Sequence, residues 1–404
     1  MAEPELEFLP DTDEGLSKGI RPTVYWYPSF RCNLACKHCS VNSSPNVDTS
    51  GDLTLEEALS VVGQLKELDA GWVILSGGEF LFRPDSLRLL EALIDAGINL
   101  GIESNGLLFT EDFVRLVQRG SSAGLQVNTT VSLDGGTSET HETLRGKNTF
   151  ERTLRGMRFL ADSGVRFSIQ CVVNRTNVQS IPNLFAEASR LMPHLHYLIF
   201  AFLHPVGRGF ELQNDMGLGM GDYREAYGLI AEGVRTFGGK TVVKVPPAMI
   251  PPEYTTKLFG AGKQSGCTTS CAFPTLGILP NGNVSICALT QNDSTVSFGN
   301  VKTDTLLDIW RRTRMDIVRR DYLSAEKLKG ICSDCTFKHV CKGGCRAFAY
   351  DESGDLQAPH PLCDALDKRG EFPPIYRLSV KRKLLGQLPT LPTRPPHTIR
   401  RSAS

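Results

Sequence analysis

The chain has 404 residues, of which 41% are apolar and 22% are charged, and its 44 basic and 44 acidic residues cancel. This length and composition are ordinary for a globular protein with room for two domains. Because there is no net charge to attract a nucleic acid or an anionic membrane, we expect neither as a partner.

No targeting segment is visible in the sequence. The N-terminus lacks a basic region followed by an apolar one, and no stretch approaches about 18 uninterrupted apolar residues. We therefore expect a cytoplasmic protein. In a reducing compartment, 12 cysteines indicate metal binding or redox chemistry rather than a disulfide scaffold, and all but Cys171 fall into two clusters.

Strands and helices alternate along the first half of the chain. A polar leader, residues 1–21, precedes a predicted strand at 22–30 that runs into a loop with three cysteines. Thr54 and Glu57 form a capping box, which predicts a helix through Leu68. Further strands are predicted at 72–75, 99–103, 126–133, 166–173 and 197–203, and further helices at 85–96, 110–119, 150–162 and 181–191. This alternation indicates parallel βαβ units.

The units imply an α/β fold of the open-barrel type. A complete eightfold barrel takes about 250 residues, but the alternating units end near residue 203, so we predict a partial (β/α)6 TIM-like barrel over residues 22–206. Barrel enzymes place their chemistry at the C-terminal ends of the strands. The loops at 32–39, 76–79, 104–106 and 134–136 all follow predicted strands, so we expect them to meet on one face.

The second half of the chain does not continue the regular alternation of strands and helices. Residues 207–266 form a bridge with a predicted helix at 223–237 and an apolar stretch at 242–245, and we assign it no role beyond connection. Residues 267–370 form a small cysteine-rich domain, in which a Pro-Asn-Gly turn at 280–282 predicts a β-hairpin. Residues 371–404 form a basic, proline-rich tail, which we interpret as a solubilising end, disordered past Gly386.

The first cysteine cluster has the spacing C-x3-C-x2-C, formed by Cys32, Cys36 and Cys39. Three thiols can hold three irons of a four-iron cluster and leave the fourth open to a ligand that is not protein. Structural zinc is the alternative, but it needs four ligands, and His38 between two of the cysteines is poorly placed to be the fourth. We favour the iron–sulfur cluster.

This loop resembles the signature of the radical S-adenosylmethionine (radical SAM) enzymes, C-x3-C-x-aromatic-C, with His38 at the aromatic position. The resemblance continues through Ser76-Gly77-Gly78-Glu79, through Glu103 to Gly106, and through Val131 to Gly135 followed by His141 and Arg145. Phe80 departs from the proline that is usual in the family. By similarity, S-adenosylmethionine is bound by Gly77, Gly78, Glu79, Ser104, Asn105, Ser132 and Arg145.

The resemblance assigns roles that suit the residue types. Glu79 would accept the methionyl amino group, while Ser132 and the forked guanidinium of Arg145 would hold the carboxylate. The family uses an electron, from a donor such as flavodoxin or ferredoxin, to cleave S-adenosylmethionine at the open iron. The resulting 5'-deoxyadenosyl radical abstracts hydrogen from a substrate, so the site must exclude water and other hydrogen donors.

The second cysteine cluster resembles the SPASM domain, which carries two auxiliary 4Fe-4S clusters. The resemblance rests on C-x10-G-x4-C around Gly282 and on C-x2-C-x5-C-x3-C from Cys332 to Cys345. By similarity, one cluster is held by Cys267, Cys271, Cys287 and Cys345, and the other by Cys332, Cys335, Cys341 and Cys363. The hairpin would bring Cys271 and Cys287 together. A zinc ribbon is the alternative for residues 332–345.

Catalytic residues beyond these sites are not identified. Ala288 follows Cys287 where sulfatase-maturing relatives carry a carboxylate base, so a sulfatase maturase is not expected. Cys171 is read first as a small buried hydrophobe and second as a hydrogen donor. The leading hypothesis is oxidation, epimerisation or decarboxylation of a biosynthetic small molecule of the sugar, nucleoside or aminocyclitol type.

Two other functions stay open. One is maturation of a ribosomally synthesised peptide by a thioether or carbon–carbon crosslink or a similar oxidation, with a separate leader-binding partner because only 31 residues precede Cys32. The other is a zinc-binding interaction module without enzymatic activity. Iron content separates the zinc module from the two enzymes, since three clusters would bring about twelve irons.

Overall fold

The computed structural model describes residues 21–251, 253–254, 275–290, 296–312 and 324–381, and one curved sheet runs through these ranges. Its strands lie in the order β10-β9-β8-β1-β2-β3-β4-β5-β6-β7. Seven neighbouring strands from β1 to β7 are parallel: β1 (Thr23–Trp26), β2 (Trp72–Leu75), β3 (Leu100–Ser104), β4 (Val127–Ser132), β5 (Phe167–Val173), β6 (Leu195–Phe202) and β7 (Lys240–Lys244). The partial parallel barrel is confirmed.

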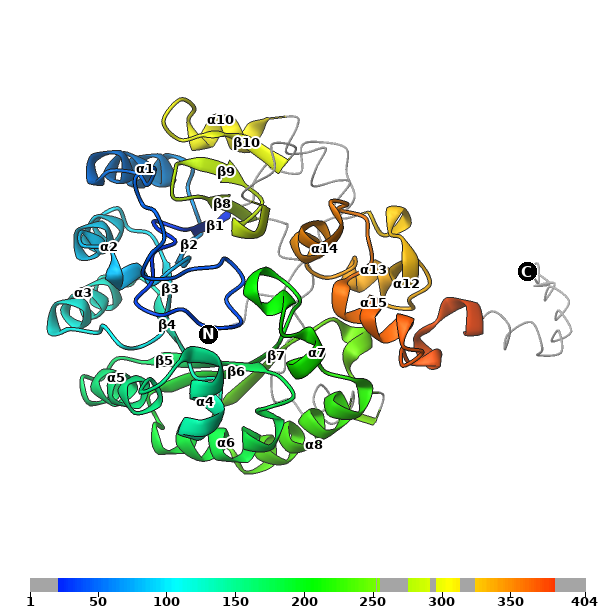
Figure 1. Cartoon of the computed structure of the whole chain (residues 1–404). Helices are drawn as coiled ribbons and strands as arrows, with labels where there is room; N and C mark the ends of the chain where they lie inside the picture. Colours follow the sequence, from blue (N-terminus) through cyan, green and yellow to red (C-terminus); the bar gives the residue numbers. More distant parts are fainter. Residues whose placement is uncertain (1–20, 252, 255–274, 291–295, 313–323, 382–404) are drawn as a thin grey trace, which may run out of the picture.

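Helices cover the outer side of this sheet (Figure 1). They are α1 (Leu55–Glu67), α2 (Ser86–Asp95), α3 (Glu111–Ser122), α5 (Phe150–Asp162), α6 (Ile181–Arg190) and α8 (Met220–Thr236). The capping box of α1 is formed, since Thr54 Oγ1 accepts from the Glu57 amide and Glu57 accepts from the Thr54 amide. Apolar faces of the helices and the sheet share one large core that includes Trp26, Phe113 and Phe200.

A short helix, α4 (Ser138–Arg145), occupies a segment that we predicted as loop. Thr137 caps its N-terminus by accepting a hydrogen bond from the Thr140 amide. Only His141 and Leu144 of this helix are buried, so its sequence carries little of the apolar periodicity that predicts a helix. Arg145 is therefore the last residue of a helix.

The bridge does more than connect two domains. Its strand β7 pairs in parallel with β6, so the sheet extends one strand beyond the six that we predicted, and α8 packs beside α6. The helix α7 (Gln213–Met216) lies in the same segment. The prediction failed here because a lone five-residue strand, KTVVK, with charged ends gives a weak pattern.

The opposite edge of the sheet is formed by the cysteine-rich half of the chain. The strand β8 (Thr275–Ile278) pairs in parallel with β1 and antiparallel with β9 (Asn283–Ser285), which pairs with β10 (Ser297–Asn300). The predicted hairpin is confirmed. Ala288, which follows β9, packs with Tyr27, and Phe30 and Val41, on either side of the first cysteine loop, pack against the same cluster.

Short helices of the C-terminal part lie at the open side of the sheet, between β8 and β7 (Figure 1). They are α12 (Gly330–Ser333), α13 (Lys338–Cys341), α14 (Arg346–Ser353) and α15 (Pro361–Lys368), and α10 (Leu306–Arg311) packs near α1. Residues 371–381, which we placed in the tail, include the buried Phe372 and Tyr376. The leader up to residue 20 and the tail from residue 382 lie outside the described residues.

Candidate active site

The loop that carries Cys32, Cys36 and Cys39 is fastened by main-chain hydrogen bonds to its neighbours. The amide of Lys37 donates to the carbonyl of Leu144, at the end of α4, at 2.8 Å. Two sulfurs accept backbone amides, with Leu34 N–H donating to Cys32 Sγ at 3.4 Å and Ser43 N–H donating to Cys39 Sγ at 3.3 Å. Amides aimed at sulfur compensate the negative charge of a bound thiolate.

The loop after β2 approaches the cysteine loop so closely that only glycine fits. Gly77 has a φ of +111°, and a Cβ on Gly78 would lie 2.0 Å from the carbonyl oxygen of Arg31. This approach allows the Gly78 amide to donate to Ser29 O at 2.9 Å and the Glu79 amide to donate to Arg31 O at 3.1 Å. The Gly-Gly-Glu motif thus joins two of the predicted loops.

Glu79 is buried, with 2% of its surface exposed, and it connects to the loop after β3. Its carboxylate accepts from the Ser104 hydroxyl at 3.0 Å and from the Asn105 amide at 2.8 Å. Burial raises the pKa of Glu79 to about 7, although these hydrogen bonds act to lower it. A buried carboxylate with a raised pKa is suited to receive an ammonium group from a ligand.

The loop after β3 also contacts the cysteine loop through a side chain. Asn105 Nδ2 donates to Asn33 Oδ1 at 2.7 Å and lies 3.9 Å from Cys32 Sγ. Burial raises the pKa of the Cys32 thiol to about 12. Because a metal ligand must be the thiolate, binding at this cysteine would release a proton.

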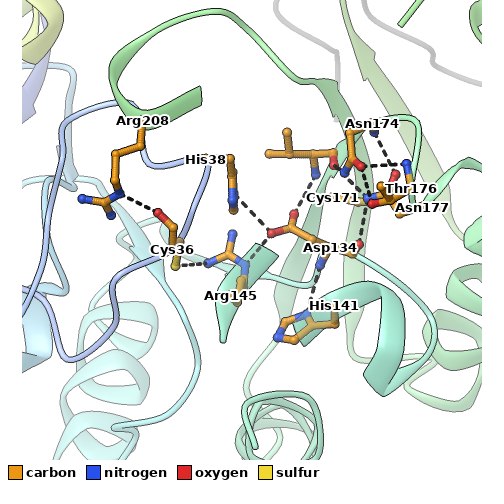
Figure 2. A network of polar contacts seen from close by, with 11 residues as sticks. Cys36, His38, Asp134, His141, Arg145, Cys171, Asn174, Thr176, Asn177 and Arg208 are labelled. Carbon is orange, nitrogen blue, oxygen red and sulfur yellow. Dashed lines mark hydrogen bonds and ion pairs between the residues drawn. The ribbon is translucent and has the colours of Figure 1, made fainter. Parts of the chain in front are cut away.

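Arg145 and Asp134 form a buried ion pair beside this loop. Arg145 Nε donates to Asp134 Oδ2 at 2.5 Å, and Arg145 Nη1 lies 4.0 Å from Cys36 Sγ (Figure 2). Burial alone would raise the pKa of Asp134, but Arg145 and His38 hold it below its ordinary value. One edge of the Arg145 guanidinium is thereby fixed in place.

His38 is a third member of this group and also contacts Asp134. Its Nε2 lies 3.3 Å from Asp134 Oδ2, and burial lowers the pKa of His38 to about 4. A ring that is neutral at pH 7 contacts this carboxylate favourably when its proton is on Nε2. The residue at the aromatic position of the signature therefore binds Asp134, which sequence reasoning did not identify as a site residue.

Asp134 is held from its other side by the end of β5 (Figure 2). Its Oδ1 accepts the Val172 amide at 2.8 Å, its carbonyl accepts Asn177 Nδ2 at 2.8 Å, and its amide donates to His141 Nδ1 at 3.2 Å. Asp134, His141 and Asn177 are buried and Val172 is partly buried, so the orientation of Asp134, and through it that of Arg145, is strongly constrained.

The bridge supplies a further residue that sequence reasoning missed. Arg208 Nε donates to the carbonyl of Cys36 at 2.8 Å (Figure 2). Arg208 Nη2 donates to the carbonyl of Ser43 at 2.7 Å. Gly207, with a φ of +54°, lies so close to Cys39 that a Cβ would be 2.5 Å from its carbonyl oxygen. A lone arginine after a glycine carries no motif, so only the structure reveals this contact.

All residues predicted to bind S-adenosylmethionine line one cavity of about 520 Å³, together with the three cysteines of the first loop. This volume is typical of small-molecule and cofactor sites. The lining continues onto Gln170, Ala201 and Lys244 of the barrel, and onto His204, Phe348 and His360 on the side of the cysteine-rich helices. The predicted convergence of the strand-end loops is present.

The auxiliary cysteines fall into two groups. One group lines a small pocket and consists of Cys332, Cys335, Cys341 and Cys363. Burial raises the pKa of Cys363, and the three neighbouring cysteines raise it further, which shows that they lie close together. Cys287 and Cys345 are also neighbours. Cys267 and Cys271 lie outside the described residues. His360, whose amide donates to Cys332 Sγ at 3.3 Å, lines both this pocket and the large cavity.

The cysteines of the described ranges form no disulfides. All ten cysteines in the described ranges are free thiols. Within those ranges no three cysteine, histidine or carboxylate side chains converge on a single-ion site. The free thiols, the amides that point at sulfur and the buried Glu79 fit an iron–sulfur cluster with S-adenosylmethionine.

Two residues singled out in the sequence lie away from the cavity. Cys171 is 2% exposed and belongs to the apolar core, whereas its strand neighbours Gln170 and Val172 line the cavity on the other face of β5. This favours packing over hydrogen donation for Cys171. Ala288 is buried in a small cluster with Tyr27 and Leu279.

The fold and site define an iron–sulfur enzyme that binds S-adenosylmethionine at the ends of barrel strands. The Radical SAM superfamily model matches residues 26–187, and the model of the SPASM iron-sulfur cluster-binding domain matches residues 267–336. The chain belongs to the radical SAM superfamily and carries a SPASM domain.

Relatives cover most of this chain. The AdoMet-dependent heme synthase of Methanosarcina barkeri is 31% identical over 84% of this chain and 95% of its own. The mycofactocin maturase MftC of Mycobacterium tuberculosis is 27% identical, covering 90% of this chain and 87% of its own.

Solved structures share the fold. Streptococcus suis SuiB bound to S-adenosylmethionine superposes with a TM-score of 0.66, at 18% identity, over 85% of this chain and 77% of SuiB. SuiB bound to its precursor peptide SuiA gives a TM-score of 0.61, at 16% identity, over 84% of this chain and 75% of SuiB. Within the described residues, we find no helix with the length and apolar character to cross a membrane.

Proposed function

We propose that this radical SAM/SPASM enzyme abstracts hydrogen from a ribosomally synthesised peptide and so matures it. The observation that carries the proposal is the single cavity in which the three-cysteine loop, Glu79, Ser132 and Arg145 meet a wall supplied by the bridge and the cysteine-rich helices. The mycofactocin maturase relative and the peptide-bound SuiB structure support a peptide over our first hypothesis of a sugar, nucleoside or aminocyclitol.

In this proposal the residues divide into three tasks. Cys32, Cys36 and Cys39 hold the first cluster, and its open iron with S-adenosylmethionine supplies the 5'-deoxyadenosyl radical. Glu79 accepts the amino group of S-adenosylmethionine, and Ser132 with the outer edge of Arg145 holds its carboxylate. Gly77, Gly78, Ser104 and Asn105 shape the pocket around these groups.

Asp134 and Arg208 act as positioning residues. Asp134 holds Arg145 through Nε, and the Nη groups, of which Nη1 lies 4.0 Å from Cys36 Sγ, would meet the ligand carboxylate. Arg208 holds the main chain at Cys36 and Ser43, which keeps the cysteine loop facing the cavity. Both positioning roles rest on these hydrogen bonds, all of which lie within the described residues.

The cysteine-rich part completes the proposal with two auxiliary clusters. The pocket formed by Cys332, Cys335, Cys341 and Cys363 supports one, and the proximity of Cys287 and Cys345 supports the other, with Cys267 and Cys271 as its remaining ligands. Electrons would come from a flavodoxin or ferredoxin in the cytoplasm. His360 lines both the pocket that contains Cys332 and the large cavity.

Co-production with candidate peptides tests the proposal. Peptides encoded by short reading frames beside the gene are produced with the enzyme, and their masses are compared with those from a Cys32→Ala, Cys36→Ala, Cys39→Ala variant. We expect a mass change that depends on the three cysteines, located by fragmentation to one or two residues. If the peptides keep their mass while an anaerobic assay with a small molecule consumes S-adenosylmethionine, the peptide function is wrong.

A second candidate function rests on the heme synthase relative, whose identity to this chain is 31%. An enzyme of this kind would act on a tetrapyrrole. The same anaerobic assay with iron coproporphyrin III in place of the peptide distinguishes the two, because only one substrate should raise the yield of 5'-deoxyadenosine above the level without substrate.

A further inference from the structure

Lys244 ends β7 and lies in the bridge, to which we assigned no role beyond connection. Its neighbour Val243 belongs to the apolar core, so Lys244 is on the opposite face of the strand, and it lines the large cavity. In the sheet register Lys244 pairs with Ala201 of β6. The small side chain of Ala201 leaves the space across which Lys244 reaches β5.

The ammonium group of Lys244 is held by a neutral partner. Lys244 Nζ donates to Gln170 Oε1 at 3.0 Å, and Gln170 also lines the cavity. A lysine ammonium has three donors, and this bond uses one of them. Among the described residues no carboxylate forms an ion pair with Lys244, so its charge is not neutralised where it borders the cavity.

The other charged groups of the cavity are distributed differently. Glu79 and Glu103 lie at the ends of β2 and β3, and Glu103 Oε2 accepts from the Ser76 hydroxyl at 2.5 Å. Arg145 is paired with Asp134. The acids are therefore on the β2–β3 side, and the cation without an acidic partner is four strands away at β7. An anionic group of a ligand is therefore favoured at β7.

We propose that Lys244, oriented by Gln170, binds a carboxylate of the substrate. The inference rests on the proposed function, and it narrows the substrate to one that presents a carboxylate near the reacting position. One ammonium beside a neutral amide suits a carboxylate better than a phosphate, which proteins hold with several amides or with a guanidinium. The carboxylate belongs to a peptide, as an Asp or Glu side chain, or to a tetrapyrrole.

A binding measurement on the reconstituted holoenzyme with S-adenosylmethionine tests the proposal. The probe is a pool of short peptides, acetylated and amidated at their ends, each with one Glu, and the matched pool has Gln instead. We expect wild-type enzyme to retain the Glu pool about tenfold better, Lys244→Met to lose this preference, and Lys244→Arg to keep it in part. Equal retention of both pools by wild-type enzyme, or a preference that survives in Lys244→Met, overturns the proposal for peptides.

Lys240, at the exposed start of the same strand, provides the matched control. Lys240→Met removes the same charge about 13 Å away along β7 and should leave the preference intact; loss of the preference in this variant as well would contradict a local role of Lys244. Iron content and thermal midpoint of each variant show that the protein is folded.

A second pair of probes separates this inference from the peptide function. Coproporphyrin III and its tetramethyl ester are compared in the same way by their absorbance. If coproporphyrin III alone binds, and binds through Lys244, the carboxylate role stands and the peptide function fails. If neither acidic probe depends on Lys244, the inference is wrong.

Discussion

Asp134 holds Arg145 through a 2.5 Å contact to Nε inside the protein, where the Asp134 side chain has no exposed surface. The pair lies between the cysteine loop, through His38, and the end of β5, through Val172. A residue that the family signature does not single out thus determines how a proposed ligand-binding arginine is presented. The arrangement leads to a first prediction.

Asp134→Asn should destabilise the protein, because it leaves the Arg145 charge buried without its counterion. Breaking such a pair costs about 3 kcal/mol, which corresponds to a thermal midpoint lower by about 6–12 °C. The control is Asp69→Asn, which removes a surface pair with Arg21 whose side chains are 71% and 57% exposed, and should cost less than about 1 kcal/mol. Equal shifts in the two variants would refute the buried-pair interpretation.

The raised pKa of Glu79 predicts a pH dependence. Between its ordinary pKa of 4.5 and the folded value of about 7, the folded chain keeps a proton that the unfolded chain has released. Stability therefore falls as pH rises through this interval. Glu79→Gln should match the ligand-free wild type near about pH 5 and exceed it near about pH 8 by on the order of 3 kcal/mol.

Comparing the two proteins at each pH isolates Glu79 from the buried histidines. Burial lowers the pKa of His38 and His141 to about 4, and their titration acts in the opposite direction. Both histidines are present in wild type and variant, so their effect cancels in the difference. A difference that stays constant from about pH 5 to about pH 8 would show that Glu79 is ionised throughout.

Two glycine substitutions should have opposite effects. Gly78→Ala would place a Cβ 2.0 Å from Arg31 O and force the two loops apart, which should cost about 1–3 kcal/mol. Gly63 lies in the middle of α1 with no atom within 4 Å of a Cβ, so Gly63→Ala should add about 1 kcal/mol. Thermal midpoints measure both, and a harmless Gly78→Ala would mean that the loops do not approach as described.

Iron content tests the assignment of the cysteines to three iron–sulfur clusters. Three clusters require about twelve irons, and Cys335→Ala with Cys363→Ala should remove about four of them. Cys171→Ala, in the apolar core, should leave iron content unchanged. Iron loss in Cys171→Ala, or full retention in the double variant, would contradict the assignment.

Much of the fold follows from the sequence because its pattern is repetitive. The strand-and-helix units, the capping box at Thr54 and the hairpin at 280–282 rest on local periodicity and turn chemistry, and each is present. The helix α4 and the strand β7 were not predicted because they lack this local periodicity. Both are short and show no clear periodicity, and their positions depend on contacts with distant segments as well as on their own sequence.

In the candidate site, too, some residues were predicted from motifs and others are recognised only in the structure. The cysteine, Gly-Gly-Glu and Arg145 positions carry recognisable spacing, and they line one cavity. Asp134, Arg208 and Lys244 reach that cavity or its loops only through contacts between residues far apart in the chain. Arg208 and Lys244 belong to no motif, and Asp134 lies in the stretch 131–135 that resembles the family but received no role, so only spatial proximity shows what each of them contacts.

We propose above all that the enzyme cleaves S-adenosylmethionine at its three-cysteine loop. The most direct measurement is 5'-deoxyadenosine formed by the anaerobically reconstituted protein with S-adenosylmethionine and dithionite. Wild-type protein should form it, and Cys32→Ala, Cys36→Ala, Cys39→Ala should not, while the SPASM cysteines stay in place. Formation of 5'-deoxyadenosine by the triple variant at the wild-type rate would contradict the account.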